Sequence, residues 1–242
     1  MRLAVISDIH GNLEAFKQVV ADIASVRADE VICLGDNVGY GPEPEAVIGL
    51  VRELGIPSVL GNHELGLNEP DYLDWFNFLA RKALLLTRDC LSAEALAYCR
   101  QLPGHLVVRD CLCVHGCPPD SPLVYIFEPS HAQLARLFQE MEQHLCFVGH
   151  THTLEVIRYD GRSIERATLD QRLISLAGEG KYIVNVGSVG QPRDDLGREA
   201  KYVVWDDASR TLELRFVPYD VSVTANKILS LGWPKYLAAR LW

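Results

Sequence analysis

The sequence predicts a mixed α+β (α/β) chain built as a four-layer α/β/β/α sandwich, in which helices cover the outer faces of two mixed β-sheets. Two observations favour this fold class. The N-terminal part alternates short apolar runs with amphipathic helical patterns, which is typical of parallel strands joined by helices. The rest of the chain is rich in short strand patterns, and two sheets packed face to face would bury the apolar sides of these strands. No repeat or linker divides the 242 residues, so we expect one domain over 1–242.

A β-α-β-α-β unit is predicted at the N-terminus. Leu3–Ser7 is a continuous apolar run, as expected of a buried strand. Asn12 is a good N-cap, and apolar side chains at helical spacing follow it to about Ala24. Pro44 is tolerated in the first turn of a second helix. The elements are the strand Leu3–Ser7, a helix from Asn12 to about Ala24, the strand Val31–Leu34, the helix Glu43–Leu54 and the strand Ile56–Leu60.

Residues 70–100 show helical patterns, with apolar clusters around Trp75 and Leu84. This segment lies between two loops that carry candidate site residues, so it is either a lid or an ordinary helical pair packed on the sheet. Ser130–Glu142 is a further amphipathic helix, and Gly161 and Asp207 fall where hairpin turns belong. The later strands are His105–Val108, Leu112–His115, Leu145–Val148, Leu154–Tyr159, Leu173–Ser175, Tyr182–Val186, Lys201–Trp205 and Leu212–Val217.

Composition and charge limit the classes of function. The net charge is −9 and no Lys/Arg block stands out, which argues against long nucleic acids but allows a small phosphorylated substrate. Seven cysteines without disulfide-like spacing indicate reduced thiols. With no signal peptide or membrane span in sight, a cytoplasmic protein without a membrane partner is expected. The C-terminal Trp233, Tyr236, Leu237 and Trp242 indicate internal packing or a contact in a homo-oligomer.

Polar side chains able to bind metal ions follow five of the predicted strands. Such strand ends meet at one edge of a sheet, where the chemistry of layered α/β proteins lies. One Asp or His after a strand is usually a cap or a core residue, but a whole set at five strand ends, beside glycines, is improbable by chance. The candidates are Asp8, His10, Asp36, Asn62, His63, His115, His150 and His152.

These residues have the composition of a two-metal site. Asp8 and His10 are two positions apart, so both can point from a strand to one ion, and His150 and His152 repeat this spacing. Asp36 can bridge two ions through its two oxygens. Imidazole, carboxylate and amide ligands without thiolates suit Mn, Fe, Zn, Ni or Co. Two such ions about 3.5–4 Å apart can hold a hydroxide between them and clamp an in-line phosphoryl displacement.

The motifs around these residues resemble those of the calcineurin-like metallophosphoesterase superfamily, in the right order over most of the chain. They are Asp8-x-His10, Gly35-Asp36, Gly61-Asn62-His63-Glu64 and Gly149-His150-x-His152. The resemblance implies one metal site of Asp8, His10, Asp36 and His152 and a second of Asp36, Asn62, His115 and His150.

The resemblance also implies that His63 orients the substrate phosphate and protonates the leaving oxygen. An imidazole suits this role because it changes charge near pH 7; the alternative is that His63 only caps a helix. One departure matters, because no arginine follows Gly35-Asp36, and the chain continues Asn37-Val38-Gly39. The chain therefore does not look like a Ser/Thr protein phosphatase. It is similar to small prokaryotic phosphodiesterases, some of which hydrolyse diadenosine tetraphosphate or model diesters.

Three further residues are candidates for substrate binding. Ser188 and Arg193 lie in a glycine-rich loop after a predicted strand, where N–H groups and a guanidinium can hold phosphate. The alternative is a plain turn in which Arg193 pairs with Asp194 or Asp195. Tyr40 stacks on a base or leans over the site, or alternatively packs against the following helix.

The predicted function is a phosphoesterase with two divalent ions, for which manganese is one candidate beside Fe, Zn, Ni and Co, that acts on a phosphodiester or a (di)nucleotide polyphosphate. In this hypothesis a metal-bridging hydroxide attacks phosphorus, Asp36 and Asn62 hold the ions, and His63 is the general acid. The alternatives are a phosphomonoesterase or protein phosphatase, and a non-catalytic protein-binding scaffold of the same fold. Since every ligand position and His63 are filled, the sequence favours an enzyme over a scaffold.

Overall fold

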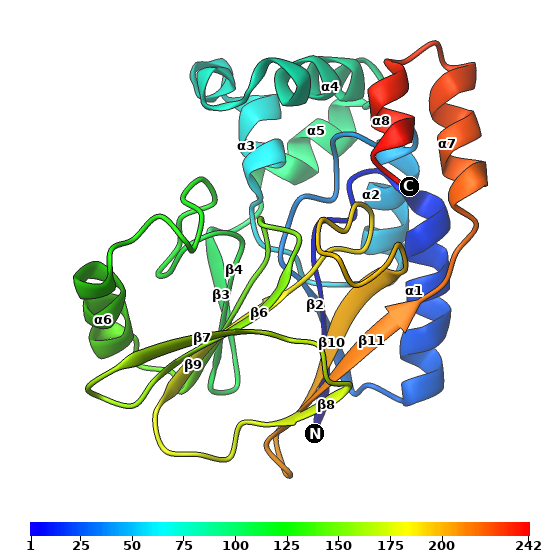
Figure 1. Cartoon of the computed structure of the whole chain (residues 1–242). Coiled ribbons are helices and arrows are strands. Elements are labelled where there is room, and N and C mark those ends of the chain that lie inside the picture. Colours follow the sequence, from blue (N-terminus) through cyan, green and yellow to red (C-terminus); the bar gives the residue numbers. More distant parts are fainter.

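The computed structural model describes residues 1–242 and contains two mixed β-sheets (Figure 1). In the first sheet, β1 lies between the parallel strand β2 and the antiparallel strand β10. In spatial order the strands are β2 (Glu30–Cys33), β1 (Arg2–Ile6), β10 (Ala200–Asp206), β11 (Thr211–Val217) and β8 (Leu173–Ser175). Segments from the two ends of the chain therefore build one sheet.

The second sheet also combines parallel and antiparallel pairs. Strand β5 is parallel to both of its neighbours, whereas the outer strands pair antiparallel. In spatial order the strands are β3 (His105–Val108), β4 (Cys111–Val114), β5 (Leu145–Val148), β9 (Lys181–Val186), β6 (Leu154–Tyr159) and β7 (Ile164–Thr168). The predicted hairpin turns are confirmed, since Gly161 lies between β6 and β7 and Asp207 between β10 and β11.

Helices cover the outer faces of both sheets, and the predicted four-layer sandwich is confirmed (Figure 1). On the first sheet, α1 (Leu13–Val26) and α2 (Pro44–Glu53) bury Phe16 and Val47. Asn12 caps α1 as predicted, because its Oδ1 accepts from the Ala15 N–H at 3.2 Å. On the second sheet, α6 (His131–Glu140) buries Leu134 and Phe138.

The largest hydrophobic cluster lies between the two sheets. Val5 and Val203 of the first sheet meet Phe147 and Val184 of the second in this cluster. Phe147 is completely buried, and burying a side chain of this size stabilises a fold by about 1.5–3 kcal/mol. The packed sheets form a rigid base from which the loops after the strands are held.

A group of helices lies at the end of the sandwich where β1 and β2 finish (top of Figure 1). Helices are confirmed within residues 70–100, and α4, α7 and α8 share a cluster around Ala83 and Trp233. Trp233, Leu237 and Tyr236 therefore pack inside this chain. The elements are α3 (Asn62–Asn68), the 3-10 helix η1 (Pro70–Trp75), α4 (Phe78–Asp89), α5 (Ala93–Arg100), α7 (Val221–Ser230) and α8 (Lys235–Ala239).

The structure corrects one sequence prediction and adds two elements for which none was made. Ile56–Leu60 is not a strand; a single bridge joins Cys33 to Ser58, because β2 is short and Pro57 has no N–H to donate. Strand β7 was not predicted because it is an edge strand with mostly exposed, polar side chains. Helix α7 was missed because its β-branched residues, among them Val221 and Val223, resemble a strand pattern.

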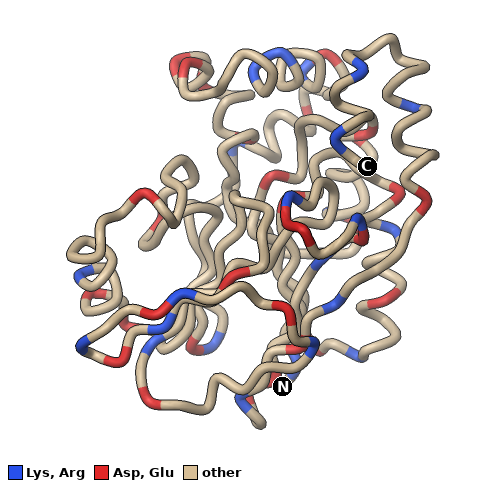
Figure 2. Tube along the Cα trace, in the orientation of Figure 1, with Lys and Arg blue, Asp and Glu red and all other residues tan.

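No helix is both long and apolar enough to span a bilayer. Lys and Arg are scattered among Asp and Glu along the whole trace (Figure 2), in keeping with the net charge of −9.

Candidate metal centre

Side chains that follow strands of both sheets meet in one buried group, as the sequence predicts. The turns after β1 and β2 come from the first sheet, and those after β4 and β5 come from the second. None of the seven predicted ligands exposes more than 8% of its surface. Burying polar side chains that lack partners is costly. A ligand bound among these side chains, such as a cation, would supply the missing partner.

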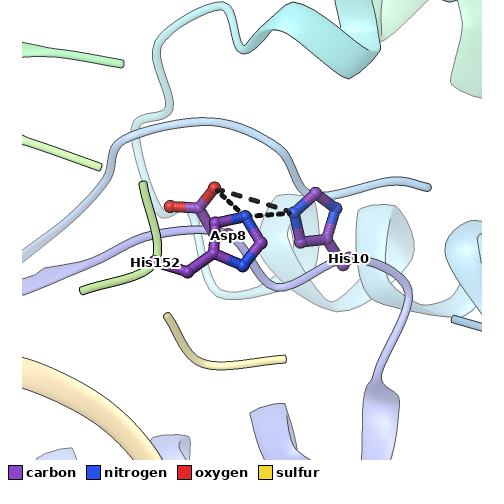
Figure 3. A group of neighbouring side chains, drawn as sticks. All are labelled: Asp8, His10 and His152. Carbon is purple, nitrogen blue, oxygen red and sulfur yellow. Dashed lines mark hydrogen bonds and ion pairs between the residues drawn. The ribbon is translucent and has the colours of Figure 1, made fainter. Parts of the chain in front are cut away.

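Asp8, His10 and His152 form the first ligand group (Figure 3). The Asp8 Oδ1 atom lies 3.2 Å from His152 Nε2 and 3.6 Å from His10 Nε2, and the two Nε2 atoms are 3.1 Å apart. Ligand atoms about 2.0–2.1 Å from one ion are about 3.0–3.4 Å from each other. Two of the three separations fall in this range and the third, at 3.6 Å, is slightly longer, so the group suits a single bound cation after a small adjustment.

The hydrogen bonds of the first group leave its ligand atoms without partners. His10 Nδ1 donates to the Val38 carbonyl at 2.9 Å and His152 Nδ1 donates to the Gln191 carbonyl at 2.6 Å. Each Nε2 atom therefore presents a lone pair to the other, and Asp8 Oδ1 has no hydrogen-bond partner. Such backbone bonds to the second ring nitrogen are typical of metal-binding histidines. A cation would relieve the repulsion and satisfy all three atoms.

The second ligand group surrounds His115. Its Nε2 atom lies 3.1 Å from Asn62 Oδ1, 3.2 Å from His150 Nδ1 and 3.3 Å from Asp36 Oδ2. His115 Nδ1 donates to the Leu34 carbonyl at 2.8 Å, which again directs the free nitrogen inward. Asp36 Oδ2 is also 3.7 Å from His10 Nε2 of the first group. Asp36 thus lies between the two groups, where a bridging ligand belongs.

Left-handed turns, rather than extended strands, aim five of the ligands. The strands end at Ile6, Cys33 and Val148, before the ligands begin. The prediction that alternation along a strand directs these side chains is therefore wrong in its reason, although they do converge. A non-glycine residue in this conformation costs roughly 1–2 kcal/mol, and such strain gathers at functional sites. The five have φ between 50° and 67°: Asp8, His10, Asp36, His150 and His152.

Glu64 holds the turn that carries Asp36, and two glycines leave room for the carboxylates of Asp36 and Asp8. The buried Glu64 carboxylate accepts from the backbone N–H groups of Asp36 at 2.9 Å, Asn37 at 2.7 Å and Gly61 at 3.1 Å. A Cβ atom on Gly61 would lie 2.2 Å from Asp36 Oδ1, and one on Gly149 would lie 2.6 Å from Asp8 Oδ2. Larger residues at these glycines would displace the carboxylates.

The ionisation of the centre favours cation binding. Burial raises the pKa of Asp36, but the facing imidazoles of His115 and His63 outweigh burial and hold it well below its usual range. Burial lowers the pKa of His150 to about 3 and that of His152 to about 4, so both are neutral ligands at pH 7. Burial also lowers the pKa of His115, but Asp36 outweighs it and raises the pKa to about 9. Positive charge is therefore favoured beside Asp36.

His63 lies beside both ligand groups and lines a cavity of about 310 Å³ that opens on them. Its Nε2 atom is 4.0 Å from Asp36 Oδ2, and its ring packs against His10, Tyr40 and Phe76 with centroids 4.7–5.1 Å apart. Nδ1 is buried without a hydrogen-bond partner. Its backbone N–H, not its side chain, serves the turn by donating to Asp36 Oδ1 at 2.8 Å.

The three predicted substrate-binding residues have different positions. Tyr40 and Arg193 line the cavity, and the Arg193 guanidinium lies 5.6 Å from the centre of the Tyr40 ring. Ser188 does not line it. The Ser188 Oγ is fully buried, donates to the Asp8 carbonyl and accepts from the Gln191 N–H, both at 2.9 Å, so it holds the Asp8 turn in place.

The alternative roles of Arg193 and Tyr40 are also resolved by their contacts. Arg193 does not pair with an aspartate; it donates to Gln191 Oε1 at 2.9 Å, and the partner of Asp194 is Lys201. The Tyr40 ring contacts His10 at a centroid distance of 4.7 Å and packs with residues of α4, α7 and α8 rather than α2.

Several residues of the cavity were not predicted. Tyr125 stacks on His150 with ring centroids 3.8 Å apart, and Arg240 comes from the turn after α8. No motif marks either residue. Trp75, Phe76 and Asn77 bring the 70–100 segment to the rim of the cavity, so the segment lies where a lid would lie, and its movement stays a prediction.

Comparisons with known proteins agree with this geometry. The family model of the calcineurin-like phosphoesterase superfamily domain matches residues 1–208. An uncharacterized protein of Methanocaldococcus jannaschii is 33% identical over 244 residues, which cover 99% of this chain and 97% of that protein. The crystal structure of a metallophosphoesterase from Sphaerobacter thermophilus is 36% identical, with a TM-score of 0.83 over 100% of this chain and 98% of that chain. A hypothetical protein from Pyrococcus horikoshii OT3 shares the fold, with 18% identity and a TM-score of 0.80 over 100% of this chain and 97% of that chain.

Proposed function

The chain belongs to the calcineurin-like phosphoesterase superfamily, and on this premise we propose that it is a phosphodiesterase or a (di)nucleotide polyphosphate hydrolase that works with two divalent ions. Membership makes phosphoric ester hydrolysis the reaction class. The observation that carries the proposal is the pair of buried ligand groups on either side of the Asp36 carboxylate, which open on one cavity.

The donor set fits two ions. Asp8, His10 and His152 would hold one ion, Asn62, His115 and His150 the other, and Asp36 both; the nitrogen and oxygen donors suit Mn, Fe, Zn, Ni or Co. When bound, two such ions would neutralise charge on the phosphate oxygens and activate a water molecule for attack.

Residues of the chain would supply the remaining functions. His63 faces the cavity beside Asp36. Burial lowers the pKa of its imidazole well below the usual value, more than Asp36 raises it, so the ring does not itself titrate near pH 7 as expected from the sequence. A phosphate bound beside it would raise that pKa and let the ring donate a proton to the leaving oxygen. Arg193 has no carboxylate partner, so its charge is available to hold a phosphate oxygen. Tyr40 packs against His63 and His10 and keeps both rings in place.

A diester or anhydride is favoured over a monoester because there is room beyond the phosphate. A second hollow of about 690 Å³ shares Tyr125 and Arg193 with the cavity at the metal centre. A phosphomonoester with a small leaving group would leave this adjoining space without a ligand, and the chain lacks the arginine after Gly35-Asp36 that would mark a protein phosphatase.

The test is a substrate panel with manganese-loaded protein. We expect hydrolysis of bis-p-nitrophenyl phosphate to exceed that of p-nitrophenyl phosphate, and we expect EDTA and Asp36→Ala to abolish it. A preference for the monoester would overturn the diesterase assignment. A metal-loaded protein that is inert on diesters, monoesters and dinucleotides would instead favour a binding scaffold.

A further inference from the structure

Three aromatic rings are stacked from the metal centre to the surface. The ring of His150 lies 3.8 Å from that of Tyr125 at an interplanar angle of 18°, and Tyr125 lies 5.0 Å from Phe127 at 14°. Phe127 exposes 61% of its surface. The stack therefore begins at a predicted metal ligand and ends in a phenyl ring that has solvent-exposed surface.

The loop that carries Phe127 is held in place. Arg166 of β7 donates to the Ile126 carbonyl at 2.7 Å, and the Ile126 side chain is buried beside α6. An exposed aromatic ring on an anchored loop loses little conformational freedom when a flat ligand stacks on it.

Phe127 borders the groove of about 690 Å³ that adjoins the metal centre. Tyr125 and Arg193 line both the cavity at the metal centre and the groove, so one ligand can extend from the cavity into the groove. A phosphate held beside the metal ligands would therefore have its substituent in this groove.

The polar residues of the groove suit a neutral group with hydrogen-bonding capacity. Glu155 pairs with Arg166 at 3.3 Å and Asp194 pairs with Lys201, and Asp195 adds a third carboxylate to the lining of the groove. With their charges largely balanced by these cations, the carboxylates can still accept hydrogen bonds from hydroxyl and amino groups of a neutral ligand. Arg193 Nε and Asp194 Oδ2 are buried without hydrogen-bond partners at the junction of the two spaces, so the loop is incompletely satisfied without a ligand.

We propose that this groove binds the nucleoside of the substrate, with its base stacked on the exposed face of Phe127, its hydroxyl or amino groups at the carboxylates that line the groove and its phosphate between Arg193 and the metal ligands. The substrates are then esters or anhydrides of nucleoside phosphates. This inference rests on the proposed function and names its substrate class. Stacking of a base on an aromatic side chain contributes about 1–3 kcal/mol.

The test compares two diesters with the same leaving group, the p-nitrophenyl ester of adenosine 5′-monophosphate and methyl p-nitrophenyl phosphate. In Phe127→Ala we expect kcat/KM for the nucleotide ester to fall about 5- to 150-fold, as the stacking energy implies, while the methyl ester is unaffected. Phe127→Trp should retain the preference. Phe78→Ala is the matched control, because Phe78 is 77% exposed but lines neither space.

Equilibrium binding separates failure of this inference from failure of the proposed function. Calorimetry with adenosine 5′-monophosphate should show the same loss of affinity in metal-loaded Phe127→Ala, and inorganic phosphate should bind both proteins equally. If the wild type hydrolyses neither ester but this loss is seen, the groove assignment stands and the diesterase proposal is wrong. Equal effects of Phe127→Ala on both esters, or no effect on either ester and on nucleotide binding, would overturn the nucleoside site.

Discussion

The position of His63 depends on the missing side chain of Gly39. Gly39 has a φ of +91°, and a Cβ atom there would lie 2.1 Å from His63 Nδ1 and 2.8 Å from Cε1. Real Cβ contacts essentially never fall below 3.0 Å, so Gly39→Ala must displace the imidazole. No metal ligand is among the atoms nearest to this Cβ. The substitution should therefore disturb the proposed general acid and spare the two ligand groups.

The expected effect on turnover is large. A shift of roughly 1 Å in a reacting group can cost about 100-fold in rate, and complete loss of a general acid costs about 10²–10⁴-fold. We expect kcat of Gly39→Ala to fall by about 100-fold on a diester with an alkoxide leaving group. On p-nitrophenyl esters the fall should be much smaller, because p-nitrophenolate leaves without a proton.

Gly161→Ala is the matched control. Gly161 has a φ of +93°, and its Cβ would meet no atom within 4 Å. Both substitutions place a Cβ atom on a left-handed backbone, which destabilises the fold by about 1–2 kcal/mol. This lowers the Tm by about 2–8 °C in a chain of this length. Only Gly39→Ala should lose kcat, with metal content unchanged. Full activity of Gly39→Ala, or an equal loss in Gly161→Ala, would show that Gly39 does not set the position of a catalytic imidazole.

Three further substitutions test other parts of the account. His63→Ala should keep both metal ions but lose about 10²–10⁴-fold in kcat on alkyl esters, and wild-type rates there would exclude a general acid role. Glu64→Gln turns an acceptor oxygen into an NH₂ group facing backbone N–H groups, so Mn²⁺ affinity should fall by about 10–100-fold in a titration; unchanged affinity would contradict this. Burial raises the pKa of Asp22, but hydrogen bonds from Arg215 and Tyr202 outweigh it and hold the pKa below its usual value of 3.8. The stability that Asp22 contributes is therefore complete above this value and is lost as the pH falls through the lower folded pKa. The Tm difference between wild type and Asp22→Asn should shrink on acidification from about pH 6 to about pH 2, and a constant difference would show that the charge is not responsible.

The residues that converge at the candidate metal centre could be predicted from the sequence, but not the way in which their side chains are aimed. Asp8, His10 and Asp36 are readable because residue type and position after an apolar run are local properties. Their left-handed turns depend on distant backbone bonds, such as those from the Asp8 N–H to the Gly35 carbonyl and from the His10 N–H to the Asp36 carbonyl. Such bonds are a property of the folded sheet.

The fold class could be predicted because hydrophobic patterns reflect which side chains are buried. The features that were not predicted are either largely exposed or depend on contacts between distant parts of the chain. Strand β7 lies at an edge, and its exposed side chains carry no alternation. The cavity residues Tyr125 and Arg240 lie far from each other in sequence, and only tertiary packing brings them to one cavity. Ser188 was assigned to the substrate because loops rich in glycine often hold phosphate, whereas its hydroxyl is used inside the loop.

The central claim, a centre for two ions that share Asp36, is tested most directly by anomalous diffraction from crystals soaked in Mn²⁺. Two peaks about 3.5–4 Å apart are expected, one beside Asp8 and His152 and the other beside His115 and Asn62, with Asp36 between them. A single peak, or none in a soak that saturates activity, would contradict the account.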